Sequence, residues 1–221
     1  MALHFDILLT VWPALLRGTL VTVELTVAVL VLATPLGVVV AELRNIRQPA
    51  IHAALAVVSW IFRGIPPLLI LFFVFFGLPF LGVTLQPFPS AVIGMTLYMA
   101  FYFAEVFRAG YESVPAGQWR AAEALGLSRA RTIIRIILPQ TLPAVLPSFI
   151  SHSTDLLKGT ALAAAVAVPE LTNAAKQVFV VTYRPFEVLL AAGAIYAVLD
   201  SVLLVLQSYG ERWSRRYRAA R

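Results

Sequence analysis

The chain has 221 residues, of which 60% are hydrophobic and only 13% are charged. A soluble domain has about 25% charged residues, so this composition excludes an ordinary soluble protein and favours the lipid bilayer as solvent. The absence of cysteine excludes disulfides and thiolate sites, and in so apolar a chain the net charge of +6 indicates charged membrane loops rather than nucleic-acid binding.

Five apolar segments are long enough to cross a bilayer, which takes about 20 residues. They are expected at residues 15–41, 52–81, 89–106, 142–168 and 187–208. The second is longer than one crossing needs and contains Gly64, Pro66 and Pro67. Because proline removes a backbone donor and clashes with the preceding turn, we expect a kink or re-entrant break there. The sequence predicts an all-α membrane protein with one transmembrane domain, residues 1–221.

Basic residues concentrate after the first, third and fifth of these segments. They are Arg44, Arg47, Arg108, Arg120, Arg129, Arg131, Arg135, Arg212, Arg215, Arg216, Arg218 and Arg221. The positive-inside rule then predicts a periplasmic N-terminus and a cytoplasmic C-terminus. The basic tail at 211–221 is expected to anchor the chain at the lipid headgroups, with no nucleic acid as partner.

The longest segment expected on the cytoplasmic side is a loop at about 112–135. Pro115 and Gly117 are expected to end the preceding helix, and a new helix can begin near Gln118 and end around Gly126. This segment predicts a short charged helix between two apolar spans.

Two features of this short helix favour a docking role. Arg120 and Glu123 are three residues apart and can pair on one face. The small side chains of Ala121 and Ala122 would let another protein approach closely. A solvated amphipathic loop is the alternative, which spacing alone does not exclude.

Charged residues within apolar spans are costly and are therefore functional candidates. Here they are Arg63, Glu105, Asp155 and Lys158. A zwitterionic substrate needs an acid for its ammonium group and a base or helix N-terminus for its carboxylate. The alternatives are that Asp155 and Lys158 neutralise each other, that Arg63 extends to the membrane interface, and that Glu105 fixes the exit to the loop.

The loop resembles the Glu-Ala-Ala loop of ATP-binding-cassette (ABC) importer permeases. The matching residues are Ala121, Ala122, Gly126, Ile136, Leu138 and Pro139. In that family the loop forms the coupling helix, which sits in a groove on the ATPase subunit. The resemblance therefore implies ATPase coupling through Gln118, Arg120, Ala121, Ala122, Glu123 and Gly126.

The resemblance narrows to the polar amino acid permeases, of the histidine, glutamine, arginine and opine type. Motifs similar to theirs occur in order at residues 16–19, 62–68, 102–110 and 114–119. Two departures stand out, because Arg120 replaces the family's Glu and Gly159-Thr160 replaces its usual Asp-Thr. The second lies in the fourth span and leaves the identity of the substrate open.

The resemblance implies the type I ABC importer permease fold, with five transmembrane helices in the bacterial inner membrane. It also implies three protein partners: an ABC ATPase dimer, a second permease that is identical or similar, and a periplasmic substrate-binding protein. The chain has no Gly-rich phosphate loop, so ATP and Mg²⁺ are expected to bind the ATPase subunit, and no metal or catalytic site is expected here. A secondary transporter or channel is the alternative, and a membrane-embedded enzyme a further one.

Overall fold

The computed structural model describes residues 6–44 and 48–219, which form helices and short connections with no strand. His4, Arg47 and Arg221 lie outside the described residues. The α-helices are α1 (Ile7–Leu43), α2 (Pro49–Gly64), α3 (Pro67–Phe72), α4 (Pro87–Glu112), α5 (Ala116–Ala124), α6 (Arg129–Thr132), α7 (Leu138–Gly159), α8 (Leu171–Thr182) and α9 (Pro185–Ala219). π-helical turns occupy Phe73–Gly77 and Ile133–Ile137, and 3₁₀ turns occupy Leu78–Leu81 and Thr160–Val166.

Four helical segments are long and apolar enough to cross a membrane. They are Ile7–Leu43, Pro87–Glu112, Arg129–Val166 and Pro185–Arg215. A fifth crossing is present if α2 and the following segment Pro67–Leu81 count as one broken span, since a bend of 100° separates them. The break expected at Gly64–Pro67 is therefore confirmed. The helix that contains the fourth expected span begins before residue 142, because it continues back through a π-turn to Arg129.

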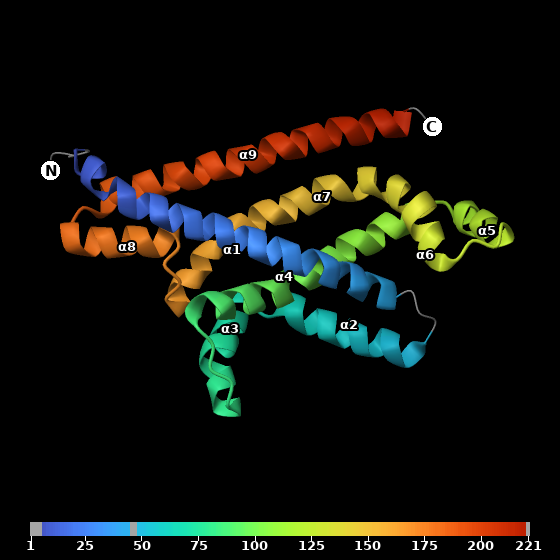
Figure 1. Cartoon of the computed structure of the whole chain (residues 1–221), viewed down its shortest axis with the longest axis horizontal. Helices are drawn as coiled ribbons and strands as arrows, with labels where there is room; N and C mark the ends of the chain where they lie inside the picture. The colour runs from blue at the N-terminus through green and yellow to red at the C-terminus, as the bar shows by residue number, and fades with distance from the viewer. Residues whose placement is uncertain (1–5, 45–47, 220–221) are drawn as a thin grey trace.

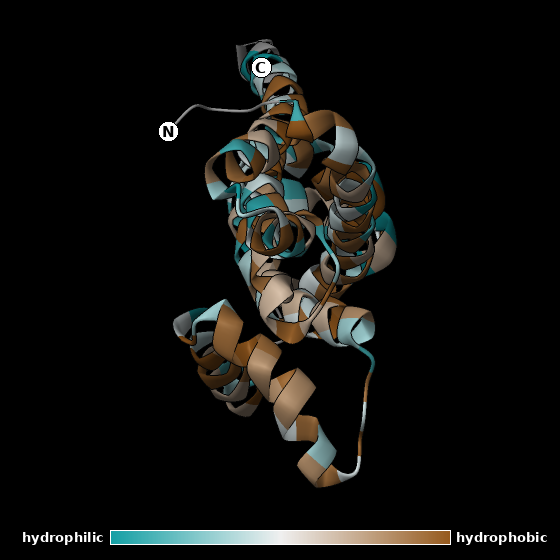
Figure 2. Cartoon of the chain, turned by 90° about the vertical axis from the view of Figure 1, so that its left-hand side faces the viewer, coloured by the Kyte–Doolittle hydropathy of each residue, from teal (hydrophilic) through white to brown (hydrophobic). Residues whose placement is uncertain are grey.

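The long helices run side by side along the length of the molecule (Figure 1). The N-terminus of α1 and helix α8 lie at one end, whereas α5 and α6 lie at the other, and α3 projects sideways from the bundle. Much of the ribbon of these helices has the colour of hydrophobic residues (Figure 2). Many large apolar side chains are exposed, among them Leu20, Val31 and Val198, as expected for side chains that face lipid.

The bundle core forms where α1 packs along α4. Gly37 lies so close to α4 that a Cβ atom there would be 2.8 Å from Cβ of Phe103 and 3.0 Å from the carbonyl oxygen of Ala100. Gly18 brings α1 equally close to α8, where a Cβ atom would be 2.7 Å from Cβ of Ala174. Two glycines on one helix thus permit two close helix contacts.

A buried carboxylate fixes the start of α8. Glu170 is fully buried and accepts hydrogen bonds from the backbone N–H groups of Thr172 (2.8 Å) and Asn173 (2.7 Å). The hydroxyl of Tyr196, from α9, donates a third hydrogen bond at 2.8 Å. Burial raises the pKa of the Glu170 carboxyl, although these hydrogen bonds favour its ionised form. The cap therefore joins α8 to α9.

Candidate coupling helix and substrate path

Helix α5 is the short charged helix that the sequence predicts, displaced by two residues toward the N-terminus. Pro115 precedes it, and Gly117 lies inside it rather than ending the helix before it. Its end is a Schellman motif, in which the N–H of Leu127 bonds to the carbonyl of Ala122 and the N–H of Gly126 to that of Glu123. Gly126 has φ +65°, where any side chain would be strained.

The inner face of α5 packs on its own chain. Ala122 is 1% exposed, and Trp119, three residues before it, packs against a cluster that includes Val114 and Ile137. The expectation that Ala122 offers a small surface to a partner was therefore wrong, because its small size serves packing within the chain.

The outer face of α5 is exposed. Ala121, Glu123 and Ala124 are exposed, and Leu125, which follows the helix, is 75% exposed. Gln118 is exposed as well, but its side-chain oxygen accepts a hydrogen bond of 3.5 Å from Nε2 of Gln140 on α7. Arg120 is exposed too, and no ion pair joins it to Glu123 in the described part of the chain, so their expected pairing was wrong. Both side chains are exposed, and an exposed helix pair gains only about 0.5 kcal/mol.

Glu105 stands at the centre of an ionic cluster that joins three helices. Its carboxylate contacts Arg44 at the end of α1, Arg63 in the last turn of α2 at 3.2 Å, and Arg108 on its own helix at 2.8 Å. Arg108 also bonds to Glu112 at 2.5 Å. Glu105 and Arg63, both candidates for the substrate path, are thus joined to each other, and this geometry favours a structural role for Glu105.

Replacing Glu105 with glutamine is expected to destabilise the protein by about 1–3 kcal/mol, because three guanidinium groups lose a shared charged acceptor. Thermal unfolding of the purified protein in detergent measures the change. Glu112→Gln is the matched control, since Glu112 is 64% exposed and pairs with Arg108 alone among the described residues, and its effect should be below about 1 kcal/mol. Equal effects of the two substitutions would contradict a central role for Glu105.

Asp155 and Lys158 lie on α7 and form no ion pair with the Glu105 cluster in the described part of the chain. Nζ of Lys158 is 3.7 Å from one carboxylate oxygen of Asp155, and Nδ1 of His152 is 4.0 Å from the other. Asp155 also lines a cavity of about 190 Å³. The pair that the sequence suggests does form, yet the carboxylate remains more than half exposed.

The cavity beside Asp155 has an aromatic wall. Tyr98 and Tyr102 of α4 line it together with His152, and their rings are 4.9 Å apart. Sequence reasoning missed these three residues, although two tyrosines four apart in one span and a histidine three residues before Asp155 were visible signals. Aromatic faces next to a carboxylate suit a cationic group.

Tyr102 connects this cavity to the Glu105 cluster. The guanidinium of Arg63 lies 5.4 Å from the centre of its ring, and its hydroxyl donates a hydrogen bond of 3.3 Å to the backbone carbonyl of Arg63. The centre of the same ring is 5.5 Å from that of His152. Cavity and cluster are therefore neighbours at the break between α2 and α3.

Among the described residues, no group of three His, Cys, Asp or Glu side chains could hold a metal ion.

A solved structure shares this architecture: one chain of an amino acid ABC transporter with histidines superposes with a TM-score of 0.87 and 28% identity, covering 96% of this chain and 99% of that one. The fold and the apolar helices define a membrane permease rather than an enzyme. Residues 33–216 match the family of binding-protein-dependent transport system inner membrane components, and the chain belongs to that family.

Relatives with known descriptions support this family assignment. The L-cystine transport system permease protein TcyB of Bacillus subtilis is 33% identical over 207 residues, which cover 93% of this chain and 88% of that protein. The arginine transport system permease protein ArtQ of the same organism is 31% identical over 214 residues, or 96% and 97% of the two chains. The similarity extends over nearly the whole chain, and the expected membership among ABC importer permeases is confirmed.

Proposed function

We propose that the chain forms the translocation path of an ATP-driven importer for a polar amino acid or an amino-acid derivative. The two relatives named above are described as permease proteins of an L-cystine and an arginine transport system, which supports this substrate class. A separate ABC ATPase dimer binds ATP and Mg²⁺, a periplasmic binding protein delivers the substrate, and a second permease, identical or similar, completes the path.

The position of α5 is the observation that supports coupling of this chain to the ATPase. It stands at the end of the molecule away from the N-terminus (Figure 1), and its outer face is exposed although the helix is firmly packed on its inner side. A rigid helix in this setting can transmit the movement of a bound partner to α4 and α7, between which it is inserted. Such movement shifts the population between inward-facing and outward-facing states.

The proposed orientation places α5 in the cytoplasm and the N-terminus in the periplasm. Arg44, Arg108, Arg120, Arg129 and Arg135 lie at or near the α5 side of the chain's apolar segments, as the positive-inside rule requires for a cytoplasmic end. With α2 and Pro67–Leu81 as one broken span, the chain crosses the membrane five times, and the termini lie on opposite sides.

The substrate path is proposed to pass the cavity between α3, α4 and α7. Asp155 would bind the ammonium group of the substrate there. The aromatic rings of Tyr98 and Tyr102 would line the space for the side chain of the substrate. Asp155→Asn is expected to raise the KM for uptake about tenfold, the effect of losing one charge-assisted contact. Glu211→Gln on α9 makes the same chemical change outside the cavity and should leave KM unchanged; a KM equally unaffected by Asp155→Asn would remove Asp155 from the path.

The proposal is tested by uptake in cells. Deleting the gene should abolish accumulation of one class of radiolabelled amino acid, and expressing the chain again should restore it. Unchanged uptake of every amino acid, with a membrane that still contains the partner ATPase, would contradict the substrate class while leaving membership of the family intact.

A further inference from the structure

A pocket of about 410 Å³ lies beside the Glu105 cluster, between the second half of α2, the end of α1 and the middle of α4. Its lining side chains include Arg44 after α1, Tyr102 on α4, and Ala56, Ser59, Trp60 and Arg63 on α2. Tyr102 also lines the cavity beside Asp155, so the pocket and the cavity share one wall. The pocket is on the side of Tyr102 that leads along α4 toward Glu105 and α5.

The depth of this pocket in the membrane follows from Arg44. A helix crosses the hydrocarbon core in about 20 residues, whereas α1 has 37 residues and ends at Leu43. Whichever part of α1 crosses the core, Arg44 therefore lies at or outside the boundary on the side of α5 and α6 (Figure 1). Arg63 contacts the same oxygen of Glu105 as Arg44 and lies at nearly the same depth. A soluble ligand can thus reach the pocket from the α5 side.

The two guanidinium groups in the wall have unused hydrogen-bond donors. Arg44 and Arg63 each contact Oε1 of Glu105 through Nη1. A guanidinium has five N–H donors, and Nη1 carries two of them, so Nε and Nη2 of each side chain keep three. Neither group forms another hydrogen bond or ion pair with a residue that the structure describes. Two cations with free N–H groups therefore line one pocket.

The cluster beside the pocket has an excess of positive charge. Arg44, Arg63 and Arg108 carry three positive charges, whereas Glu105 and Glu112 carry two negative ones, which leaves one positive charge. A bound monoanion would neutralise this charge. Because a guanidinium presents a planar fork of donors, a planar carboxylate fits it well.

A buried hydroxyl in the same wall also lacks a partner. Ser59 is 3% exposed, and its side chain forms no hydrogen bond with any residue that the structure describes. Ser90 and Ser153, which are buried in other helices, each donate to the carbonyl four residues earlier. Since buried hydroxyls ordinarily have a partner, Ser59 is free to donate to a ligand in the pocket.

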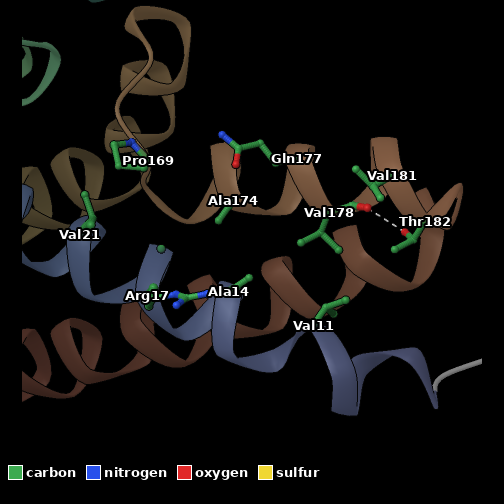
Figure 3. A pocket seen from close by; sticks show the side chains of 11 residues that line it. Val11, Ala14, Arg17, Val21, Pro169, Ala174, Gln177, Val178, Val181 and Thr182 are labelled. Carbon is green, nitrogen blue, oxygen red and sulfur yellow. Dashed lines mark hydrogen bonds between the residues drawn. The ribbon is translucent and has the colours of Figure 1, made fainter.

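The groove between α1 and α8 lacks this combination of groups (Figure 3). It encloses about 640 Å³, and Arg17 is the one charged residue among the described residues that line it. Aliphatic side chains such as Val11 and Val178 form much of its wall. The pocket at Arg44 and Arg63 offers two cations and a buried hydroxyl, which favours it as an anion site.

We propose that this pocket binds the carboxylate group of the transported amino acid, on the cytoplasmic side of the cavity beside Asp155; that the ligand is the transported one rests on the proposed function. The free N–H groups of Arg44 and Arg63 and the hydroxyl of Ser59 donate to the carboxylate oxygens. Trp60 provides an apolar surface for the rest of the ligand. An amino acid that leaves Asp155, which holds its ammonium group, thus meets a second site of opposite charge.

Titration of the purified full chain in detergent tests the proposal, with the fluorescence of Trp60 as the signal. N-acetylglycine has a carboxylate and no ammonium group, glycinamide has an ammonium group and no carboxylate, and inorganic phosphate at pH 8 is mainly a dianion. We expect N-acetylglycine to give a saturable change that Trp60→Phe lacks. Glycinamide should give none, and phosphate should bind more weakly, because its charge exceeds the single positive charge of the cluster.

Two variants change the pocket in different ways. Ser59→Ala removes the hydroxyl and leaves the Glu105 cluster in place, and it should weaken binding of N-acetylglycine about fivefold, the effect of one hydrogen bond. Ala56→Phe fills the pocket, keeps both guanidinium groups and should abolish binding. Ala54→Phe is the matched control, since Ala54 is exposed on α2 and does not line the pocket.

Three results would overturn the proposal. One is unchanged binding of N-acetylglycine by a folded Ala56→Phe variant, and another is binding of glycinamide or phosphate as tight as that of N-acetylglycine. The third is no binding of N-acetylglycine at all, which would remove the pocket from the path even where uptake in cells is normal. The proposed function fails separately, because cells without amino-acid uptake would contradict it even where the purified chain binds N-acetylglycine.

Discussion

Substitution of Ala121 by tryptophan is expected to abolish capture of the ABC ATPase by the permease. Ala121 is exposed on α5, so a bulky ring there would hold a docked partner away from the helix. The variant should fold normally, because the substituted side chain points away from the packed face formed by Trp119 and Ala122. Affinity purification from the native membrane, followed by quantification of the ATPase subunit, measures the effect, and we expect a loss of more than tenfold, since interfaces concentrate their binding energy in a few central residues.

Ala194→Trp is the control for this experiment. Ala194 is exposed on α9, distant in sequence from α5, and the same enlargement there should leave the ATPase bound. Ala122→Trp is a poor choice, because Ala122 is buried and its enlargement would disturb the fold itself. An Ala121→Trp variant that still captures the ATPase in full would mean that α5 is not the docking element.

Substitution of Gly37 by valine is expected to separate α1 from α4 and to destabilise the bundle severely. The first added carbon would meet Cβ of Phe103 at 2.8 Å, the carbonyl oxygen of Ala100 at 3.0 Å and the backbone nitrogen of Ala104 at 3.2 Å. Two of these atoms belong to backbone and cannot turn aside, so the helices must move apart. Overpacking of a core costs about 1–3 kcal/mol, and we expect the upper end of this range or more.

Gly193→Val provides a matched control within α9, because a Cβ atom at Gly193 meets nothing within 4 Å. That substitution should change stability by less than about 1 kcal/mol, as expected from helix propensity alone. Thermal unfolding in detergent, followed by fluorescence-detected gel filtration, compares the two variants. Similar melting temperatures for both would contradict the close contact between α1 and α4.

Local chemistry made parts of this structure predictable. The prolines at 66 and 67 indicated the break between α2 and α3, because a ring without an N–H cannot continue a helix. Gly126 indicated the end of α5, because only glycine fits the left-handed residue of its cap without strain. The apolar segments indicated the long helices, although their ends shifted where a π-turn or a 3₁₀ turn prolonged a helix.

The parts that could not be predicted depend on contacts between distant residues. Glu105 meets Arg44, which is 61 residues away in the chain, and Arg63 from another helix. The spacing of residues along one helix gives no information about such contacts between helices. For the same reason, the sequence did not indicate which face of α5 is buried, and Ala122, expected to present a small surface to a partner, is buried against its own chain. The aromatic wall beside Asp155 likewise required α4 and α7 to be placed together.

The most direct test of the central claim is the ATPase turnover of the complex reconstituted in lipid vesicles. The complex contains this chain, its ATPase subunit and its binding protein, and turnover is measured with a panel of amino acids. The proposed function predicts that one class of amino acid, presented by the binding protein, stimulates turnover, and that Ala121→Trp abolishes this stimulation. An intact complex whose turnover responds to no amino acid would contradict the proposed substrate class, and transport without any captured ATPase would contradict ATP-driven import.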